Sequence, residues 1–178
     1  MSASRLLTST GTLVDIAKPD PSSIHIVDIA HHLARICRFN GAVQYPYSVA
    51  QHSLMVSELV HSEHALPGLL HDAAEAYLGD ISTPVKALLG PAYADLERRW
   101  NLAIGERFGL GAQLADQHPA IKAADDRALA TERRDLMPVN PGWKPTAEPY
   151  EREVRAIAPE FAKDAFLNRF DRLNGGKR

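Results

Sequence analysis

Apolar residues recur every three or four positions along most of this 178-residue chain, and prolines and glycines separate one run from the next. In the stretch PAYADLERRWNLAIGERFG, residues 91–109, apolar side chains follow at intervals of four between a proline and a glycine. Such spacing gives an α-helix one apolar face, which must pack against another element. The pattern predicts an all-α helical bundle. Helices are expected over residues 28–39, 48–60, 67–79, 83–89, 91–108, 119–136 and 159–173.

Two segments depart from helical spacing. Residues 5–18 mix apolar and polar residues around a Ser-Thr-Gly turn, which indicates a short two-stranded hairpin. Residues 138–149 contain four prolines and are expected to form an irregular surface loop. No internal repeat divides the chain, so residues 1–178 are expected to form a single domain.

Composition argues against several classes of protein. The formal net charge is −2 with no block of like charges, so a basic surface that binds nucleic acid is not expected. No apolar run approaches the ~18 residues of a membrane span, and none near the N-terminus has the length found in signal peptides. Cys37 is the only cysteine, which rules out an internal disulfide and suits a reducing compartment. We therefore expect a soluble, cytoplasmic protein.

Ionisable residues occur within the otherwise apolar third expected helix. Residues 69–86 read LLHDAAEAYLGDISTPVK, so His71, Asp72 and Glu75 lie within about one turn of each other. On a helix these residues share one side, among leucines and alanines that are typical of a packed segment. Burying imidazole and carboxylate groups without partners is unfavourable. A divalent cation is the simplest compensation for them.

A cation needs more ligands than one helix provides. His52 lies among apolar residues of the second expected helix, and Asp125 follows two alanines in the sixth. With His71 and Asp72 these residues would make a mixed nitrogen and oxygen site. Such a site suits manganese, cobalt, iron, nickel or zinc better than calcium, with magnesium as a further option. Asp126 is the alternative to Asp125. The competing interpretation is that each histidine caps a helix or bonds a backbone carbonyl.

These residues resemble a known family. His52, the pair His71-Asp72 and Asp125, in this order on successive helices, are similar to the metal signature of the HD-domain phosphohydrolases. The pattern EAYLGDISTPVK, residues 75–86, resembles the small nucleotidases of that family. They include bacterial 5′-deoxynucleotidases and phage dATP triphosphohydrolases. The resemblance covers about residues 28–136 and implies an HD-domain helical bundle in which the four residues of the signature ligate the metal.

The resemblance also implies roles for residues beyond the metal ligands. Glu75 would orient or deprotonate the attacking water, and Asp80 would contact the sugar or assist the leaving oxygen. Lys86 would hold a phosphate. An arginine near the end of the helix before the first metal histidine is also part of the family pattern. Arg38 matches it best, and Arg35 is the alternative.

The expected chemistry follows from these residue types. Hydrolysis of a phosphate ester needs positive charge at the phosphoryl oxygens and a water made nucleophilic near neutral pH. A carboxylate such as Glu75 can take the proton of that water, while Lys86 and Arg38 supply fixed positive charge. We therefore expect a hydrolase that acts on a nucleotide, in particular a deoxynucleotide. Monophosphate and triphosphate substrates remain open.

Two other interpretations remain. One is a non-catalytic HD module that binds a nucleotide as a sensor; Glu75 and Asp80 argue against it, because a binding module does not need acids that handle water. The other is a helical bundle whose polar residues are satisfied within the core. By resemblance, the expected partners are a small nucleotide substrate and further copies of the chain, in a dimer or hexamer.

Aromatic and charged residues outside the signature have weaker expectations. Phe39 adjoins Arg38 and is the aromatic residue expected to stack on a base, with Tyr77 and Trp143 as alternatives. The run ERRD, residues 132–135, is expected to form a solvated face with salt bridges.

Overall fold

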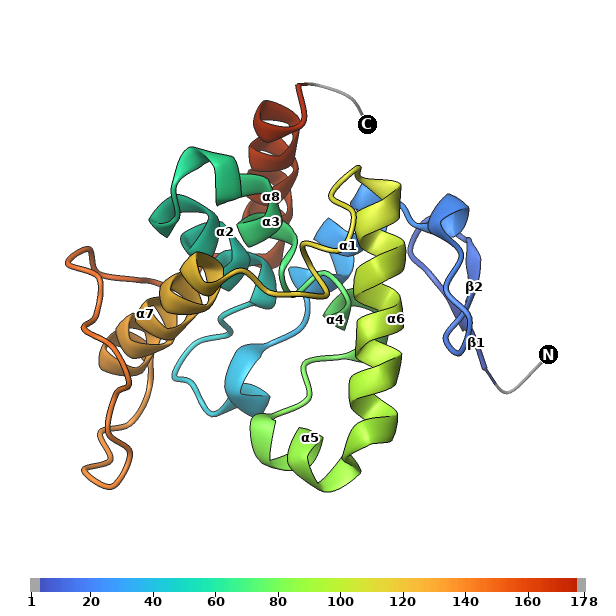
Figure 1. Cartoon of the computed structure of the whole chain (residues 1–178). Coiled ribbons are helices and arrows are strands. Elements are labelled where there is room, and N and C mark those ends of the chain that lie inside the picture. The colour runs from blue at the N-terminus through green and yellow to red at the C-terminus, as the bar shows by residue number, and fades with distance from the viewer. Residues whose placement is uncertain (1–3, 176–178) are drawn as a thin grey trace.

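Helices form most of the computed structural model, which describes residues 4–175 (Figure 1). This agrees with the all-α prediction. The helices are α1 (Ile26–Leu33), α2 (Val49–Leu59), α3 (Ala65–Leu70), α4 (Glu75–Leu78), α5 (Thr83–Leu89), α6 (Pro91–Arg107), α7 (Pro119–Leu136) and α8 (Pro159–Leu173). Short 3₁₀ turns occur at Pro21–Ser23, Arg38–Gly41 and Ser62–His64.

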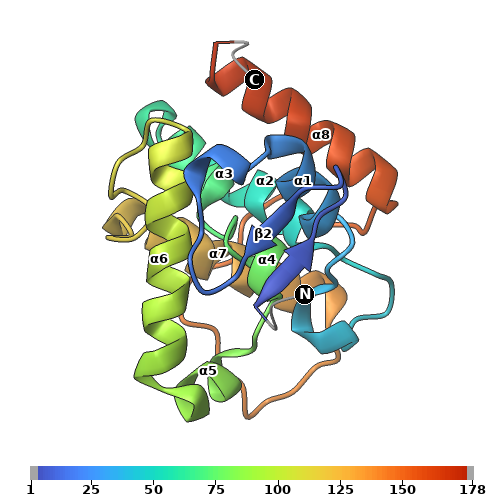
Figure 2. The same ribbon diagram turned by 90° about the vertical axis from the view of Figure 1, so that its right-hand side faces the viewer.

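The expected N-terminal hairpin is also present. Strands β1 (Arg5–Leu7) and β2 (Leu13–Asp15) pair antiparallel, with Leu6 opposite Val14. Figure 2 shows the hairpin in front of α1. Its turn is bonded to Asp28 of α1, which accepts hydrogen bonds from the Ser9 hydroxyl at 2.6 Å and the Thr10 backbone at 2.7 Å. These bonds fix the hairpin to the helical core.

The core lies where α8 packs across α1, α2 and α3 (Figure 1). Phe166 and Phe170 of α8 are fully buried there, as the apolar spacing of that helix predicts. Phe161, on the same helix, is exposed instead. Helix α6 contributes Trp100, whose ring stacks on Tyr77 of α4 at a centroid distance of 4.1 Å. The short helix α4 is thereby fixed on the core.

The first expected helix is shorter than the sequence predicts. It ends at Leu33 and does not continue through residue 39. The following segment pairs with the residues before α2: the Val49 backbone donates to the Ile36 carbonyl at 3.0 Å, and Arg38 donates to Tyr47 at 2.9 Å. The helix ends because these tertiary backbone bonds replace the helical ones.

The third expected helix is not continuous. It consists of α3 and α4, and the residues between them, 71–74, form a tighter turn. Backbone bonds there span three residues, as in Ala73 to Leu70 at 3.0 Å and Glu75 to Asp72 at 3.0 Å. The Gly68 carbonyl, which an α-helix would use for its own ladder, accepts a bond from the His71 ring at 2.8 Å. This side-chain bond offers a physical reason for the interruption.

The remaining predicted helices agree closely with α5, α6, α7 and α8. The Ser48 hydroxyl caps α2 by accepting from the Gln51 backbone at 3.3 Å. The Gln51 side chain bonds the backbone of Arg155 and Ile157. Within residues 4–175, no helix has the length and apolar character needed to cross a membrane.

Candidate metal centre

Three of the predicted metal ligands converge. His52 comes from α2, and His71 and Asp72 come from the tight turn between α3 and α4. Each offers one ligand atom, and these atoms all lie within 4.8 Å of one another. Asp72 Oδ2 lies 3.2 Å from His71 Nε2 and 3.6 Å from His52 Nε2. The group could therefore hold a metal ion.

Both imidazole rings have their Nδ1 atoms occupied. His52 Nδ1 bonds the Glu132 carboxylate at 2.7 Å, and His71 Nδ1 bonds the Gly68 carbonyl at 2.8 Å. Because both partners are acceptors, each Nδ1 is a donor. Within residues 4–175, the buried Nε2 atoms have no hydrogen-bond partner. Two buried imidazoles that leave Nε2 unpartnered beside a carboxylate fit a cation well.

Asp125 lies beside this group, on α7. Its Oδ1 atom is 3.2 Å from His52 Nε2, so it could complete a set of four ligands. Asp126, the alternative, forms an ion pair with Lys122 one turn earlier on the same helix. Lys122 also lies 3.3 Å from the outer oxygen of Asp125. The placement favours Asp125 over Asp126.

Arg38 is the arginine at the site. Its Nη1 lies 3.9 Å from Asp72 Oδ2, and its Nε and Nη2 bond Glu132 Oε2 at 3.1 and 3.0 Å. Arg35 points away and pairs with Glu160 at 3.3 Å, where both side chains are largely exposed. Between the two candidates, only Arg38 could reach a ligand bound beside the metal group.

Glu132 contradicts the prediction that residues 132–135 form a solvated face. Its side chain is fully buried between His52 and Arg38. Only the end of the run behaves as predicted, since Arg134 pairs with Asp135 at 2.6 Å. Glu132 lies seven residues, or two helical turns, after Asp125, and so faces the same side of α7. That spacing was the signal available in the sequence.

The electrostatics of the group reflect its crowded carboxylates. Burial opposes ionisation of Asp72 and Asp125, but the nearby histidines outweigh burial, so the pKa of each lies well below its usual range. Burial and Arg38 oppose a charge on His52, yet the carboxylates of Glu132 and Asp125 raise the pKa of His52 to about 10. In the protein without a cation, a proton on His52 Nε2 would supply the positive charge that a bound metal ion would otherwise supply.

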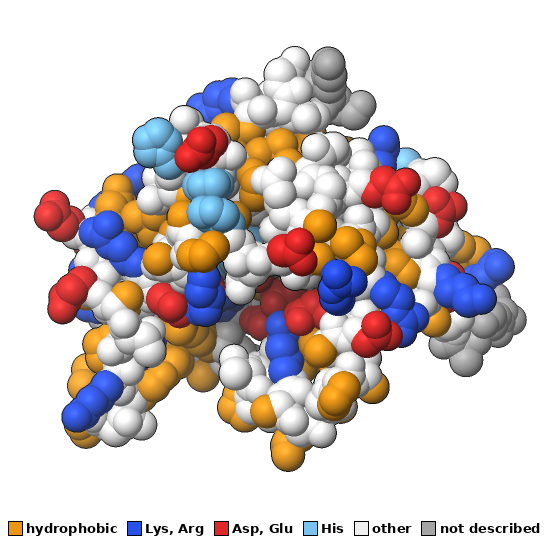
Figure 3. All heavy atoms as spheres, viewed as in Figure 1, with side chains coloured by type: hydrophobic (Ala, Val, Ile, Leu, Met, Phe, Trp, Pro, Cys, Tyr) orange, Lys and Arg blue, Asp and Glu red, His pale blue; other side chains and the backbone are white. Residues whose placement is uncertain are grey.

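Glu75, Asp80 and Lys86 lie on the other side of the group. Burial, together with the charges of Asp72 and Asp80, raises the pKa of Glu75 well above its usual value. Its Oε2 is buried without a partner, and its Oε1 lies 3.8 Å from Lys86 Nζ. Burial also raises the pKa of Asp80. Figure 3 shows acidic side chains gathered in a recess above the position of α5.

Lys86 has a partner that the sequence did not predict. Its ammonium bonds Glu97 of α6 at 2.6 Å and lies 5.6 Å from the ring centre of Tyr93. Burial opposes the charge, but this hydrogen bond and the charges of Glu97 and Glu75 raise the pKa of Lys86. The lysine is thus directed between Glu97 and Glu75. Residue spacing alone gave no signal for a partner on another helix.

Phe39 has an unusual backbone. Its φ of 57° and that of Asn40, 53°, lie in the left-handed region that bulky residues rarely adopt. The Phe39 ring lies 5.1 Å from the guanidinium carbon of Arg38. Of the alternatives, Tyr77 is buried against Trp100 in the core, and Trp143 stacks on Arg133 in the proline-rich loop. Phe39 is therefore the aromatic candidate nearest to the site arginine.

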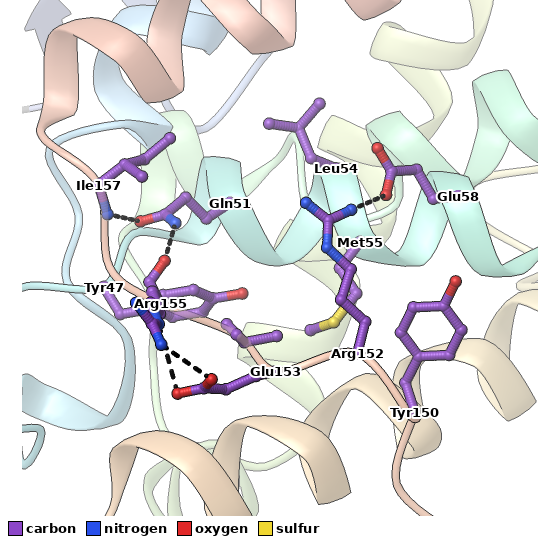
Figure 4. A pocket seen from close by; sticks show the side chains of 11 residues that line it. Tyr47, Gln51, Leu54, Met55, Glu58, Tyr150, Arg152, Glu153, Arg155 and Ile157 are labelled. Carbon is purple, nitrogen blue, oxygen red and sulfur yellow. Dashed lines mark hydrogen bonds and ion pairs between the residues drawn. The ribbon is translucent and has the colours of Figure 1, made fainter.

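A second groove lies apart from this group. It has a volume of about 210 Å³ and runs between α2 and residues 150–157 (Figure 4). None of the predicted site residues lines it. Gln51 crosses it by accepting from the Ile157 backbone at 3.2 Å and donating to the Arg155 carbonyl at 3.1 Å. These bonds hold the segment before α8 against α2.

Comparisons with known proteins find relatives in two bacteria. No family model matches the chain. It is 41% identical over 164 residues to YfdR of Escherichia coli K12, and the match covers 88% of each chain. It is 47% identical over 137 residues to RCAP_rcc00048 of Rhodobacter capsulatus, with coverage of 71% of this chain and 70% of the relative. Both relatives are named as uncharacterized proteins. The chain belongs to the family of these two bacterial proteins.

Proposed function

We propose that the protein is an HD-domain phosphohydrolase that uses a divalent metal ion to hydrolyse a phosphate ester of a deoxynucleotide. The observation that carries this proposal is the buried group of His52, His71 and Asp72, in which neither Nε2 atom has a hydrogen-bond partner among the described residues. Asp125 adds a second carboxylate beside them. The order of these residues along the chain matches the signature that the sequence resembles.

The ligand types restrict the metal. Two imidazole nitrogens and two carboxylates suit manganese, cobalt, iron, nickel or zinc, and magnesium is a weaker match because it prefers oxygen. A cation held there would supply positive charge for phosphoryl oxygens and lower the pKa of a water beside it. His52, His71, Asp72 and Asp125 would hold it.

The residues around the metal group would handle the proton and the phosphate. Glu75, with a raised pKa and a free buried oxygen, is placed to accept a proton from the attacking water near neutral pH. Asp80 would contact the sugar or assist the leaving oxygen. Arg38, 3.9 Å from Asp72, and Lys86, 3.8 Å from Glu75, would bring positive charge to the phosphate oxygens.

A nucleotide screen tests the proposal. Purified protein would be incubated with deoxynucleoside and ribonucleoside mono- and triphosphates, each with manganese, cobalt, zinc or magnesium. Malachite green would detect released phosphate, and chromatography would show whether phosphate or triphosphate leaves. We expect turnover of a deoxynucleotide and none with Asp72→Ala. Nucleotide binding without turnover by any metal would instead support the sensor interpretation.

A further inference from the structure

Glu132 is a buried carboxylate with both oxygens occupied. Oε1 accepts from His52 Nδ1 at 2.7 Å, and Oε2 accepts from Arg38 Nε at 3.1 Å and forms an ion pair with Arg38 Nη2 at 3.0 Å. The Tyr47 hydroxyl, also buried, bonds the same carboxylate. An ionised carboxylate is costly to bury without partners. Here the partners belong to two different parts of the site, one to the metal group and one to the phosphate side.

The bond to His52 determines which nitrogen faces the metal group. Because Glu132 accepts a hydrogen bond from His52 Nδ1, Nε2 is left as the ligand atom. It lies 3.2 Å from Asp125 and 3.6 Å from Asp72. Carboxylates that hold a metal-binding imidazole in this way also fix the plane of the ring. Without Glu132, the ring could rotate or present its other nitrogen.

The bonds to Arg38 determine the direction of the guanidinium. Glu132 binds the edge formed by Nε and Nη2, which leaves Nη1 directed toward the metal group, 3.9 Å from Asp72 Oδ2. Arg38 is itself mostly buried, so few other orientations are open to it. One carboxylate therefore orients a metal ligand and the nearest anion-binding group at once.

We propose that Glu132 is a positioning residue that couples metal binding to phosphate binding in this site. The inference rests on the proposed function for the phosphate half, whereas the metal half stands on the geometry of His52. Coupling means that each ligand raises the affinity for the other, by a factor that depends on Glu132. A purely structural ion pair would support the fold but would leave this factor unchanged.

The variant Glu132→Gln separates these roles. The amide oxygen can accept from His52 or from Arg38, but the amide nitrogen then faces a donor on the other side. The substitution therefore preserves shape and satisfies only one partner. The matched control is Glu160→Gln, the same change at the partner of Arg35, where the ion pair is exposed.

Calorimetric titration gives the first test. Zinc alone and inorganic phosphate with and without saturating zinc would be titrated into the wild type and both variants. We expect Glu132→Gln to weaken zinc binding by about 10- to 100-fold. We also expect the factor by which zinc raises the affinity for phosphate to fall toward one in this variant. Glu160→Gln should match the wild type. A folded Glu132→Gln variant with wild-type zinc affinity and coupling would overturn the proposal.

A second measurement reads the histidines directly. In zinc-loaded protein, long-range ¹⁵N–¹H correlation spectra distinguish a ring bound through Nε2 from one bound through Nδ1. We expect Glu132→Gln to alter the His52 pattern and to leave His71, which bonds Gly68, unchanged. An unaltered His52 pattern together with unchanged coupling between zinc and phosphate would contradict the proposal, because the amide oxygen can keep only one of its two partners. Both readouts are independent of hydrolysis, so failure of the nucleotide screen would not affect the metal half.

If Glu132→Gln does not fold, the variant Glu132→Asp tests the positioning role instead. Aspartate keeps the buried negative charge but is one methylene shorter, so it cannot reach His52 and Arg38 together at hydrogen-bond distance. We expect it to fold, to bind zinc more weakly than the wild type and to lose coupling to phosphate. Wild-type zinc affinity and coupling in Glu132→Asp would refute the positioning role.

Discussion

The two sides of the candidate site are built differently. The metal side rests on α2, α7 and the tight turn after α3, and its central side chains, His52 and Glu132, are fully buried. The opposite side, residues 75–86, includes the short helix α4 beside the middle of α6 and the start of α5 near its lower end (Figure 1). Gly79 and Gly90 flank α5 with φ values of 81° and 66°. The metal side is fixed by packing, and on the opposite side α4 also packs on the core, whereas α5 has no buried residues and is flanked by two glycines.

The difference indicates a division of tasks. On the metal side the orientation of each imidazole ring is set by a second group, Glu132 for His52 and the Gly68 carbonyl for His71. On the opposite side Glu75 has an unpartnered oxygen, and Lys86 is held by one exchangeable bond to Glu97. We infer that the metal side is pre-organised, while the α5 side is able to adjust when a substrate binds.

The largest expected effect is loss of the metal. Asp72→Ala and His52→Ala each remove one of the three closest ligand groups, so little redundancy remains. We expect neither purified variant to retain the transition metal, and both to lose hydrolysis. Elemental analysis measures occupancy, and circular dichroism checks that the helices persist. Full metal occupancy in Asp72→Ala would show that the ligand set is wrong.

The next largest effect tests the side opposite the metal group, residues 75–86, by a change that leaves the metal ligands intact. Glu75→Gln keeps the shape of the side chain and removes its ability to accept a proton. We expect normal metal content and a fall in kcat of about 10²-fold or more, as for loss of a general base. Steady-state kinetics with metal analysis on the same sample provide the measurement. Near-normal turnover would reduce Glu75 to a structural role.

The sequence predicted more of the fold than of the local connections. Prolines located α5, α6, α7 and α8 closely, because each helix begins at or beside a proline, and α6, α7 and α8 also bury apolar residues at regular spacing. The interrupted third helix and the early end of α1 were not predictable in this way. Both depend on hydrogen bonds to residues that the pattern does not connect, such as the His71 ring on Gly68.

The candidate site shows the same limit. Residue type and helical spacing singled out His52, His71 and Asp72, which the structure brings together. The partners that orient the site were missed. Glu132 was assigned to a solvated face because its neighbours Arg133, Arg134 and Asp135 are charged, although burial at residue 132 depends on what α7 packs against. A charged run reports average exposure, not the environment of one position on a helix.

The third prediction changes the attachment of α5. Gly90 has φ 66° and ψ −150°, a conformation that residues with a Cβ adopt at a cost of about 1–3 kcal/mol. A Cβ there would meet no atom within 4 Å, so Gly90→Ala tests the backbone alone. We expect lower stability in denaturant unfolding and a changed KM, with metal affinity retained.

The control for this prediction is Gly142→Ala in the proline-rich loop. Gly142 is exposed and does not have a positive φ, and a Cβ there would lie 3.2 Å from the oxygen of the exposed Asn140 side chain, which can shift. We therefore expect an effect within about 0.5 kcal/mol. If Gly90→Ala reduced metal affinity as much as it changed KM, the two sides of the site would not be independent, and the contrast between them would fail.

The fourth prediction concerns the phosphate contact of Lys86. Lys86→Ala should raise KM by about tenfold, as expected for loss of one charged hydrogen bond, with a larger effect on a triphosphate than on a monophosphate of the same base. Glu97→Gln should have a smaller effect in the opposite direction, because it weakens the competing partner at 2.6 Å. Lys144→Ala, in the exposed loop, is the control. Unchanged kinetics in Lys86→Ala on both substrates would place the phosphate pocket elsewhere.

The smallest effect concerns how the hairpin supports the α5 side. Asp28 holds the hairpin turn, and His32 on the same helix bonds both the Ser9 backbone and the Ala76 carbonyl of α4. Burial opposes ionisation of Asp28, but hydrogen bonds from Ser9 and Thr10 outweigh burial and lower its pKa below the usual value. The folded protein therefore binds this proton less readily than the unfolded chain does.

The sign of the pH effect follows from that lowered pKa. The stability that Asp28 contributes is present above pH ~4 and is lost as the pH falls through its folded pKa. An asparagine side chain cannot ionise, so Asp28→Asn should be less stable than the wild type by about 1 kcal/mol at neutral pH, and the difference should shrink below pH ~4. Urea unfolding of both proteins between pH ~3 and ~7, without metal, measures that difference across the window in which the carboxyl titrates. A gap that stayed constant over this range would mean that the Asp28 charge does not hold the hairpin. In that case only Trp100 and the core would hold α4 in place. Acid would then weaken the side of residues 75–86 no more than it weakens the metal side.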